Sequence, residues 1–454
     1  MLDMTTKEMI DRSGIIINPC KTCQPVGAIY AALGVHRCMP HSHGSQGCVS
    51  FHRMYLTRHF KEPAIASTSS FTEGASVFGG GSNLKTAVKN IFDIYDPDII
   101  AVHTTCLSET IGDDLNAYIQ DMDIPDGKFV IHTNTPSYVG SHISGFSNMM
   151  CGFIKYLSKS TDAKNGRAAI FPGFVNPGDI REVKRLAELM GVGYTMFPDT
   201  SGVMDAPMTG KYEMYPRGGT TIPEIVSLGD CDRAFGLGVI TNEQPAKDLE
   251  RKCSVPYSLL RLPIGVAATD EFISALSHYS KNEVPYPLEE ERGQLVDIML
   301  DAHQYYYKKS VAIYGDPDTV LGLTSLVLEM GMIPKYVLTG TTKEDFVRMS
   351  ESLFLAYGVD GCRAKAAGDL FLLHQWIKND PVDLMIGGTH GKQIARAENI
   401  PLIRAGFPII DRYVHSYMPI VGYRGAMRLI EMISNALMDQ QDRDCADEDV
   451  EIVM

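Results

Sequence analysis

The chain of 454 residues carries 41 basic and 55 acidic side chains, and its formal net charge is -14 at pH 7. This length predicts several domains, while the acidic balance without a block of Lys and Arg excludes a typical nucleic-acid-binding protein. The sequence has no recognisable signal peptide and no apolar run of about 18 residues, so we expect a soluble, cytoplasmic protein that does not span a membrane.

The predicted helices and strands alternate along the chain. Helical periodicity covers 82–95, 177–191 and 317–331, and Pro317 suits the first turn of the last of these helices. The strand-like runs are apolar throughout, which is typical of parallel strands buried on both faces. The alternation therefore predicts an α/β fold of three doubly wound domains, in which helices flank parallel sheets. The predicted strands are 98–105, 128–135, 168–174, 310–316, 334–340 and 382–388.

Polar segments with Gly or Pro indicate the domain boundaries. One is SKSTDAKNGR at 158–167, and the other is KNEVPYPLEEERG at 281–293. We expect the acidic C-terminal tail, from residue 439 onwards, to be a solvated surface segment. The predicted domains are an N-terminal domain (1–160), a second α/β domain (161–292) and a C-terminal domain that includes the tail (293–454).

Three of the ten cysteines lie in segments rich in Gly, Pro and polar residues. These are Cys23 in PCKTCQPVGA, Cys48 in HSHGSQGC and Cys106 in HTTCLSETIGDD. Gly44 and Gly47 would let the backbone approach a bulky ligand. The helix-like run after Cys48 would place its thiolate near a helix N-terminus, which lowers the pKa of a thiol. Together the three segments favour an iron-sulfur cluster.

Two other interpretations of these cysteines stay open from the residues alone. Any one of them would more often be a buried core residue than a ligand. Cys20 and Cys23 form a CxxC pair, but a zinc site needs a second pair or histidines at matching spacing, and none follows. Ligands of parallel sheets bind beyond the carboxyl ends of the strands, which draws attention to Cys106 and to Ser137. A serine there is ordinarily a turn or cap residue.

Segments spread over almost the whole chain resemble the beta subunits of nitrogenase molybdenum-iron proteins. The short N-terminus is similar to the clostridial and archaeal type of that subunit. The segments that carry the resemblance are INPCKTCQPVGAIYAALG, HGSQGCVSFHRMYLTRHFKEP, SFTEGASVFGG, TTCLSETIGDDLNAYI, HTNTPSYVGSHISGF and RAGFPIIDRYVHSY.

The resemblance implies a P-cluster, an eight-iron, seven-sulfur centre shared with an alpha subunit. By matching motifs, its ligands on this chain are Cys23, Cys48 and Cys106, all within the first predicted domain, and Ser137 ligates one iron through oxygen when the cluster is oxidised. A hard alkoxide beside thiolates suits such a redox-linked change of ligand.

The resemblance also implies partners. Two alpha and two beta subunits form a heterotetramer, and a nitrogenase iron protein docks on it transiently in an ATP-dependent manner. Electrons would pass through the P-cluster to the iron-molybdenum cofactor, which lies in alpha and not on this chain, for the reduction of dinitrogen to ammonia. Phe78 in ASVFGG matches an aromatic residue of the docking surface. No catalytic residue is therefore expected on this chain.

A second metal site is implied between two beta subunits. Asp297 and Asp301 are four residues apart and would share one face of a helix, as two oxygen ligands of a hard cation require. The resemblance adds Glu62 and the backbone carbonyl of Lys61 as ligands of a single Fe or Ca ion. From the sequence alone, a solvated acidic helix face explains the two aspartates as well.

Other residues near the cluster motifs have minor expected roles. His41 and His43 are predicted to orient the cluster loop or to contact the alpha subunit. Phe51 stands where many relatives of this kind have tyrosine, and Cys20 and Cys38 are predicted not to be ligands.

Several alternative functions remain. A cofactor-assembly scaffold subunit of the same superfamily would commonly lack one of the three cysteines. A vanadium or iron-only nitrogenase beta subunit differs in few residues, and light-independent protochlorophyllide reductase is a further relative. A non-redox α/β protein with buried cysteines would contain no iron.

Overall fold

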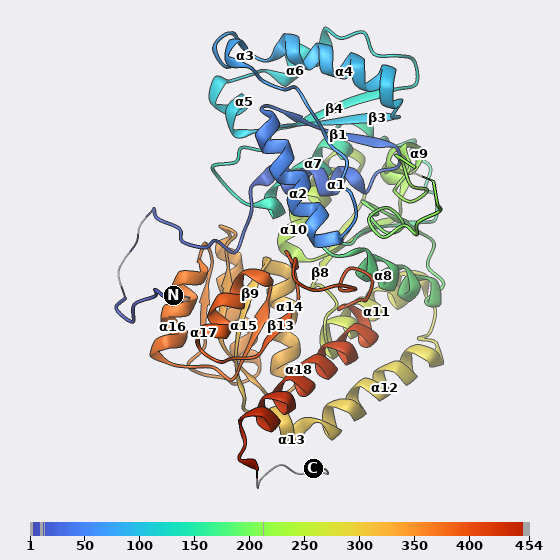
Figure 1. The fold of residues 1–454 in the computed structure, drawn as a ribbon. Coiled ribbons are helices and arrows are strands. Elements are labelled where there is room, and N and C mark those ends of the chain that lie inside the picture. Colours follow the sequence, from blue (N-terminus) through green and yellow to red (C-terminus); the bar gives the residue numbers. More distant parts are fainter. Residues whose placement is uncertain (1–2, 10–11, 13, 212, 448–454) are drawn as a thin grey trace. The chain divides into compact units, whose positions relative to one another are not determined.

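The structure is a computed structural model that describes residues 3–9, 12, 14–211 and 213–447. Its strands form three sheets, and every pair of neighbouring strands is parallel (Figure 1). The predicted α/β fold of parallel sheets flanked by helices is confirmed. The chain divides into two compact units, residues 21–260 and residues 1–20 with 261–454. No helix in the described part is long and apolar enough to cross a membrane.

The first sheet, in the 21–260 unit, has the strand order β2-β1-β3-β4. Helix α4 packs Leu84 and Val88, one turn apart, against Ile100 and Val102 of β3. Helices α4 and α6 lie on one side of this sheet and α1 and α7 on the other (Figure 1). The elements are α1 (Gln24–Leu33), β1 (Cys38–His43), α2 (Gln46–Phe60), β2 (Ser67–Thr68), α3 (Glu73–Phe78), α4 (Gly81–Tyr95), β3 (Ile99–Thr104), α5 (Cys106–Ile111), α6 (Leu115–Gln120), β4 (Phe129–Thr133) and α7 (His142–Leu157).

The second sheet belongs to the same unit and has the order β6-β5-β7-β8. Pro177 occupies the first turn of α8, where its missing N–H costs no helical hydrogen bond. The elements are β5 (Ala168–Phe171), α8 (Pro177–Leu189), β6 (Tyr194–Met196), α9 (Ile222–Val226), β7 (Arg233–Leu237), α10 (Val239–Cys253) and β8 (Tyr257–Leu260).

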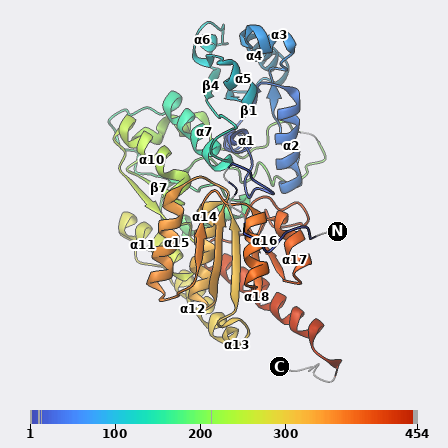
Figure 2. The same ribbon diagram turned by 90° about the vertical axis from the view of Figure 1, so that its left-hand side faces the viewer.

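The third sheet, in the other unit, has the order β11-β10-β9-β12-β13. Figure 2 shows α14 and α15 on one side of it and α16 and α17 on the other. The elements are α11 (Val266–Ser280), α12 (Tyr286–Asp301), α13 (His303–Tyr306), β9 (Ser310–Gly315), α14 (Pro317–Glu329), β10 (Ile333–Thr339), α15 (Glu344–Ala356), β11 (Arg363–Lys365), α16 (Leu370–Asn379), β12 (Leu384–Gly387), α17 (Lys392–Ala397), β13 (Leu402–Arg404) and α18 (Gly422–Asp444).

The predicted elements and linkers can be placed on this fold. Each of the six predicted strands overlaps an observed one, and the three predicted helices are α4, α8 and α14. Residues 158–167 form a loop, but 281–293 is a loop only as far as residue 285, because α12 begins at Tyr286. The start of the acidic tail is helical, since α18 ends at Asp444, and residues 448–454 lie outside the described part. The two predicted domain boundaries stay a prediction.

Candidate metal centre

The carboxyl ends of three neighbouring strands meet at one edge of the first sheet. Strands β1 and β3 are paired up to their last residues, His43 and Thr104, and β4 lies on the other side of β3. The chain that leaves these three strands carries Cys48, Cys106 and Ser137 in turn. Because the strand order reverses between β1 and β3, this edge is the topological switch point where doubly wound sheets bind ligands.

All three predicted cysteine ligands lie at helix N-termini. Cys23 is the N-cap residue of α1, Cys48 lies in the first turn of α2, and Cys106 is the first residue of α5. Unpaired backbone N–H groups give such helix ends a partial positive charge, which stabilises a thiolate. The sequence indicated this placement for Cys48 alone, with the helix after it, whereas α2 begins two residues before Cys48.

The three thiols form a loose group around Cys48. All three are free and half-buried, and Cys48 interacts electrostatically with both Cys23 and Cys106. Within the described residues, however, the three sulfur atoms do not form a group in which all lie within 4.8 Å of one another. The three sulfur atoms are therefore not arranged as ready ligands of a single tetrahedral zinc ion.

The Cys23 and Cys106 thiols favour their protonated form before a metal binds them. Burial raises the pKa of the Cys23 thiol to about 11. Burial and the neighbouring Cys48 also raise the pKa of the Cys106 thiol. Binding of iron would therefore release protons from these side chains. The resulting thiolates would be stabilised both by the iron and by the partial positive charge of the helix N-termini.

His52 is a contact of the site that the sequence did not indicate. Its Nε2 lies 3.2 Å from Cys23 Sγ, and the ring is only 3% exposed. Burial lowers the pKa of His52 to about 4, so the imidazole is neutral at pH 7. The available signal was its position four residues after Cys48, which places both side chains on one face of α2.

Gly44 allows a close contact within the protein, and its predicted approach to a bulky ligand stays a prediction. A Cβ atom on Gly44 would lie 1.9 Å from Thr105 Oγ1, so this glycine lets the turn after β1 touch the turn before Cys106. A Cβ atom on Gly47 would meet nothing closer than Ser45 Oγ at 4.0 Å. The close approach at Gly44 is therefore to the protein itself, and Gly47 makes no close approach in the chain.

The prediction for His41 and His43 needs a partial correction. Both side chains are fully buried, so they do not lie on a surface that meets a partner subunit. His41 Nε2 and His43 Nδ1 each lie 2.8 Å from Ser69 Oγ, and His43 Nε2 lies 3.0 Å from Asp113 Oδ2. The two histidines instead form hydrogen bonds inside the protein, close to the edge of the first sheet where the chain leads to Cys48 and Cys106.

The other predicted residues near this edge differ in exposure. Ser137 lies half-buried in the turn after β4. Phe78 ends α3 and is 90% exposed, as a docking residue would be, and Phe51 on α2 is also exposed. Cys20 packs in the apolar core beside the third sheet, and Cys38 begins β1 with its thiol buried. That they are not ligands stays a prediction.

The residues predicted for the second metal site are distributed over the two units. Lys61 ends α2 in a left-handed conformation (φ 67°), Glu62 follows it, and both belong to the 21–260 unit. Asp297 and Asp301 are exposed on α12 in the other unit, four residues apart as predicted.

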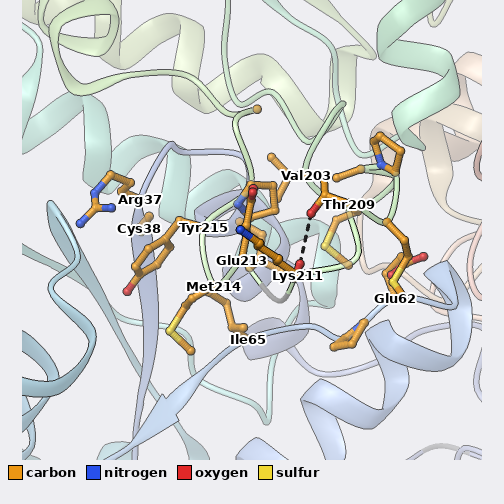
Figure 3. Close-up of a pocket in the computed structure, with 18 of the residues that line it drawn as sticks. Arg37, Cys38, Glu62, Ile65, Val203, Thr209, Lys211, Glu213, Met214 and Tyr215 are labelled. Carbon is orange, nitrogen blue, oxygen red and sulfur yellow. Dashed lines mark hydrogen bonds between the residues drawn. The ribbon is translucent and has the colours of Figure 1, made fainter.

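A cavity of about 330 Å³ lies in the 21–260 unit, and Cys23, Cys48 and Cys106 are not among the residues that line it. Its wall includes Ile65, Met214 and Tyr215 together with Cys38 and Glu62 (Figure 3). Cys38 is the first residue of β1, so the cavity is at the end of that strand opposite to the turn that leads to Cys48. The cavity is not part of the cluster edge.

The described residues contain one group of His and carboxylate side chains whose ligand atoms all lie within 4.8 Å, namely Asp3, His374 and Glu398. His374 Nε2 lies 2.7 Å from Glu398 Oε1, and Lys378 forms an ion pair with Asp3. These contacts already satisfy the group without a metal ion.

Comparison with known proteins identifies the family. Residues 23–438 match the nitrogenase component 1 type oxidoreductases. The chain is 60% identical, over the full length of both, to the nitrogenase molybdenum-iron protein beta chain of Clostridium pasteurianum. It is 39% identical to the beta chain of that name from Methanococcus maripaludis, over 97% of each chain. The chain belongs to the nitrogenase component 1 family.

Solved structures of this family agree with the fold. A chain of the structure titled "Nitrogenase Cp1 at pH 6.5" superimposes with a TM-score of 0.99 at 60% identity, over the whole of both chains. A chain of "Nitrogenase Cp1 at pH 5" superimposes with a TM-score of 0.71 at 16% identity, which shows a shared fold. Membership of the nitrogenase family implies an oxidoreductase with metal-sulfur clusters and a partnership of alpha and beta chains. Three free thiols at helix N-termini are a donor set that fits such a cluster.

Proposed function

We propose that this chain is the beta subunit of a nitrogenase molybdenum-iron protein, and that Cys23, Cys48 and Cys106 bind half of its P-cluster. The observation that carries the proposal is that three free, half-buried thiols lie at three helix N-termini on the switch-point edge of the first sheet. Relatives that bear this name and share 39% to 60% of the residues support it.

The residues of this chain would perform distinct tasks. When bound, the P-cluster supplies a centre that accepts and releases electrons. The three cysteines lose their protons and bind iron as thiolates, which the helix ends stabilise. Ser137 would offer a harder oxygen ligand that favours oxidised iron, and its hydroxyl group would lose its proton to solvent on ligation. His52 contacts Cys23 Sγ on the protein side.

The proposed assembly contains two alpha and two beta subunits. The alpha subunit would supply the remaining cluster ligands and hold the iron-molybdenum cofactor on which dinitrogen is reduced to ammonia. The iron protein would dock transiently, with ATP, on the face that presents Phe78, and the 90% exposure of this apolar side chain supports such a contact. Catalysis then lies on the partner chain, and this chain relays electrons.

The test uses the purified alpha-beta complex, with iron content and the electron paramagnetic resonance (EPR) spectrum of the oxidised state as readouts. Cys106→Ala should lose cluster iron and the signal. Cys151→Ala is the matched control, because Cys151 is also half-buried in the 21–260 unit but lies on α7. Equal cluster content in both variants and the wild type would overturn the ligand assignment.

Metal analysis of the same complex separates the alternatives. Molybdenum in the alpha subunit supports the proposal, vanadium or iron alone indicates a related nitrogenase, and a complex that releases its cofactor to other proteins indicates an assembly scaffold. We also propose that Lys61, Glu62, Asp297 and Asp301 bind one Fe or Ca ion between two beta subunits. Asp297→Asn with Asp301→Asn should remove one ion per site, whereas an unchanged metal content would refute this site.

A further inference from the structure

The turn that carries Ser137 is hydrogen-bonded to Gln24, the residue after Cys23. Gln24 is the first residue of α1 and is 3% exposed. Its Nε2 donates to the carbonyl oxygens of Pro136, at 3.0 Å, and Val139, at 2.9 Å. These two carbonyls lie on either side of Ser137, so both hydrogens of one amide hold the turn closed around it.

Neighbouring residues fix the orientation of this amide. Asn148 on α7 donates from Nδ2 to Gln24 Oε1 at 3.0 Å, so every hydrogen-bonding group of the Gln24 side chain has a partner. The Gln24 backbone is also pressed against α7, because a Cβ atom on Gly145 would lie 1.9 Å from its carbonyl oxygen. A buried and satisfied amide of this kind has little freedom to change its position.

The start of the same turn is hydrogen-bonded to the end of β3. Thr135 Oγ1 donates to the Thr104 carbonyl oxygen at 2.7 Å, and Thr135 N donates to Thr104 Oγ1 at 2.7 Å. Thr104 is the last residue of β3 and lies two residues before Cys106. The turn is therefore anchored to the segments of two of the proposed cysteine ligands, with Ser137 between the anchors.

We propose that Gln24 is a positioning residue that presents the Ser137 oxygen to the metal cluster, a role that rests on the proposed function. Ligation by Ser137 would break its O–H bond and form an iron–oxygen bond. The proton would pass to solvent, and the electron lost by the iron would pass to the iron-molybdenum cofactor of the alpha subunit. Without the Gln24 amide the turn opens, and the oxygen leaves its ligating position. Because a hard anionic oxygen stabilises oxidised iron, its loss raises the reduction potential.

The experiment is a redox titration of the alpha-beta complex followed by EPR, with iron content measured alongside. It compares the wild type, Gln24→Leu, Ser137→Ala and the double variant. Gln24→Leu should keep its iron and move the midpoint potential upwards, towards that of Ser137→Ala. The double variant should titrate like Ser137→Ala alone, because Gln24 acts through Ser137.

Asn242→Leu is the matched control. Asn242 is a fully buried amide that donates to the carbonyl oxygens of Phe171 and Leu237 beside the second sheet. Its loss should leave the midpoint potential unchanged. If the Gln24→Leu complex does not accumulate, Asn148→Ala serves instead, because it removes the hydrogen bond to Gln24 Oε1 and introduces a strong helix former into α7. A smaller upward shift of the midpoint potential is expected.

The outcomes separate the two proposals. If the midpoint potential shifts in Ser137→Ala but not in iron-replete Gln24→Leu, only the positioning role of Gln24 is overturned. Strictly additive shifts in the double variant, or loss of iron from both Gln24→Leu and Asn148→Ala, also overturn it, since each marks a general structural effect. An unshifted, iron-replete Ser137→Ala complex overturns the ligand role of Ser137 and the positioning role with it.

Discussion

His52 Nε2 lies 3.2 Å from Cys23 Sγ and so connects α2 to the N-terminus of α1. The ring is buried and neutral, and a neutral imidazole has one N–H to donate. A hydrogen bond to a ligating sulfur stabilises the more negative, reduced state of an iron-sulfur cluster and raises its potential. If Cys23 ligates the cluster as proposed, we expect this contact to raise the reduction potential of the cluster.

Substitution of His52 should lower the reduction potential of the cluster. We expect His52→Leu to shift the midpoint potential downwards by about tens of millivolts, which corresponds to the free energy of a lost hydrogen bond. His52→Gln should shift it less. The measurement is an EPR redox titration of the alpha-beta complex. His59→Leu is the control, because His59 is a buried residue of the same helix whose Nε2 lies 2.8 Å from Asn176 Oδ1. Equal shifts in both variants would contradict the assignment.

Substitution of Gly44 should separate the two turns that carry Cys48 and Cys106. In Gly44→Ala the new Cβ atom would overlap Thr105, at 1.9 Å from Oγ1, so the turns must move apart. We expect a loss of about 1–3 kcal/mol in the free energy of unfolding together with a reduced iron content. Thermal unfolding and iron analysis of the complex measure the two effects.

The control for this variant is Gly47→Ala. Gly47 lies in the first turn of α2, is exposed, and has no atom within 4 Å of a new Cβ except Ser45 Oγ at that limit. Its replacement should leave stability and iron content close to those of the wild type. A similar loss in both variants would show that the site needs flexible backbone here rather than the close contact at Gly44.

The sequence predicts six of the apolar strands, but it does not predict β1. Its sequence, CMPHSH, contains Pro40 and three polar residues, although all six residues are buried. The polar side chains are tolerated because they bond within the protein: Ser42 Oγ lies 2.7 Å from His103 Nε2, and His41 contacts Ser67 and Ser69. The partners lie far away in the sequence, so no local pattern could indicate a buried strand.

The candidate site could also be predicted only in part. The unusual Gly- and Pro-rich surroundings of Cys23, Cys48 and Cys106 pointed to ligands, and the resemblance added Ser137. The residues that contact these ligands could not be predicted. In the sequence, Gln24 looks like an ordinary residue of a first helical turn, and His52 looks like an ordinary residue of a helix. Their roles follow from which elements pack together, namely α1 with α7 and with α2.

The buried His41 should make the stability of the protein depend on pH. Burial, together with the neighbouring His43, lowers the pKa of His41 to about 3, whereas the unfolded chain has the ordinary value of about 6.5. Above about pH 6.5 neither state is protonated; below it the unfolded state alone takes up a proton, so stability falls as the pH falls towards the folded pKa. Between about pH 6.5 and about pH 5 this one group should cost about 2 kcal/mol.

The measurement of this effect is the urea midpoint of the purified complex across that pH range. His41→Gln should flatten the decline, since it removes the proton uptake on unfolding while its amide can still reach Ser67 or Ser69. His278→Gln is the control, because His278 is exposed on α11 and its loss should leave the slope as it is in the wild type. If His41→Gln declined as steeply as the wild type, His41 would not be the group whose protonation accompanies unfolding, and the remaining buried histidines would carry the slope.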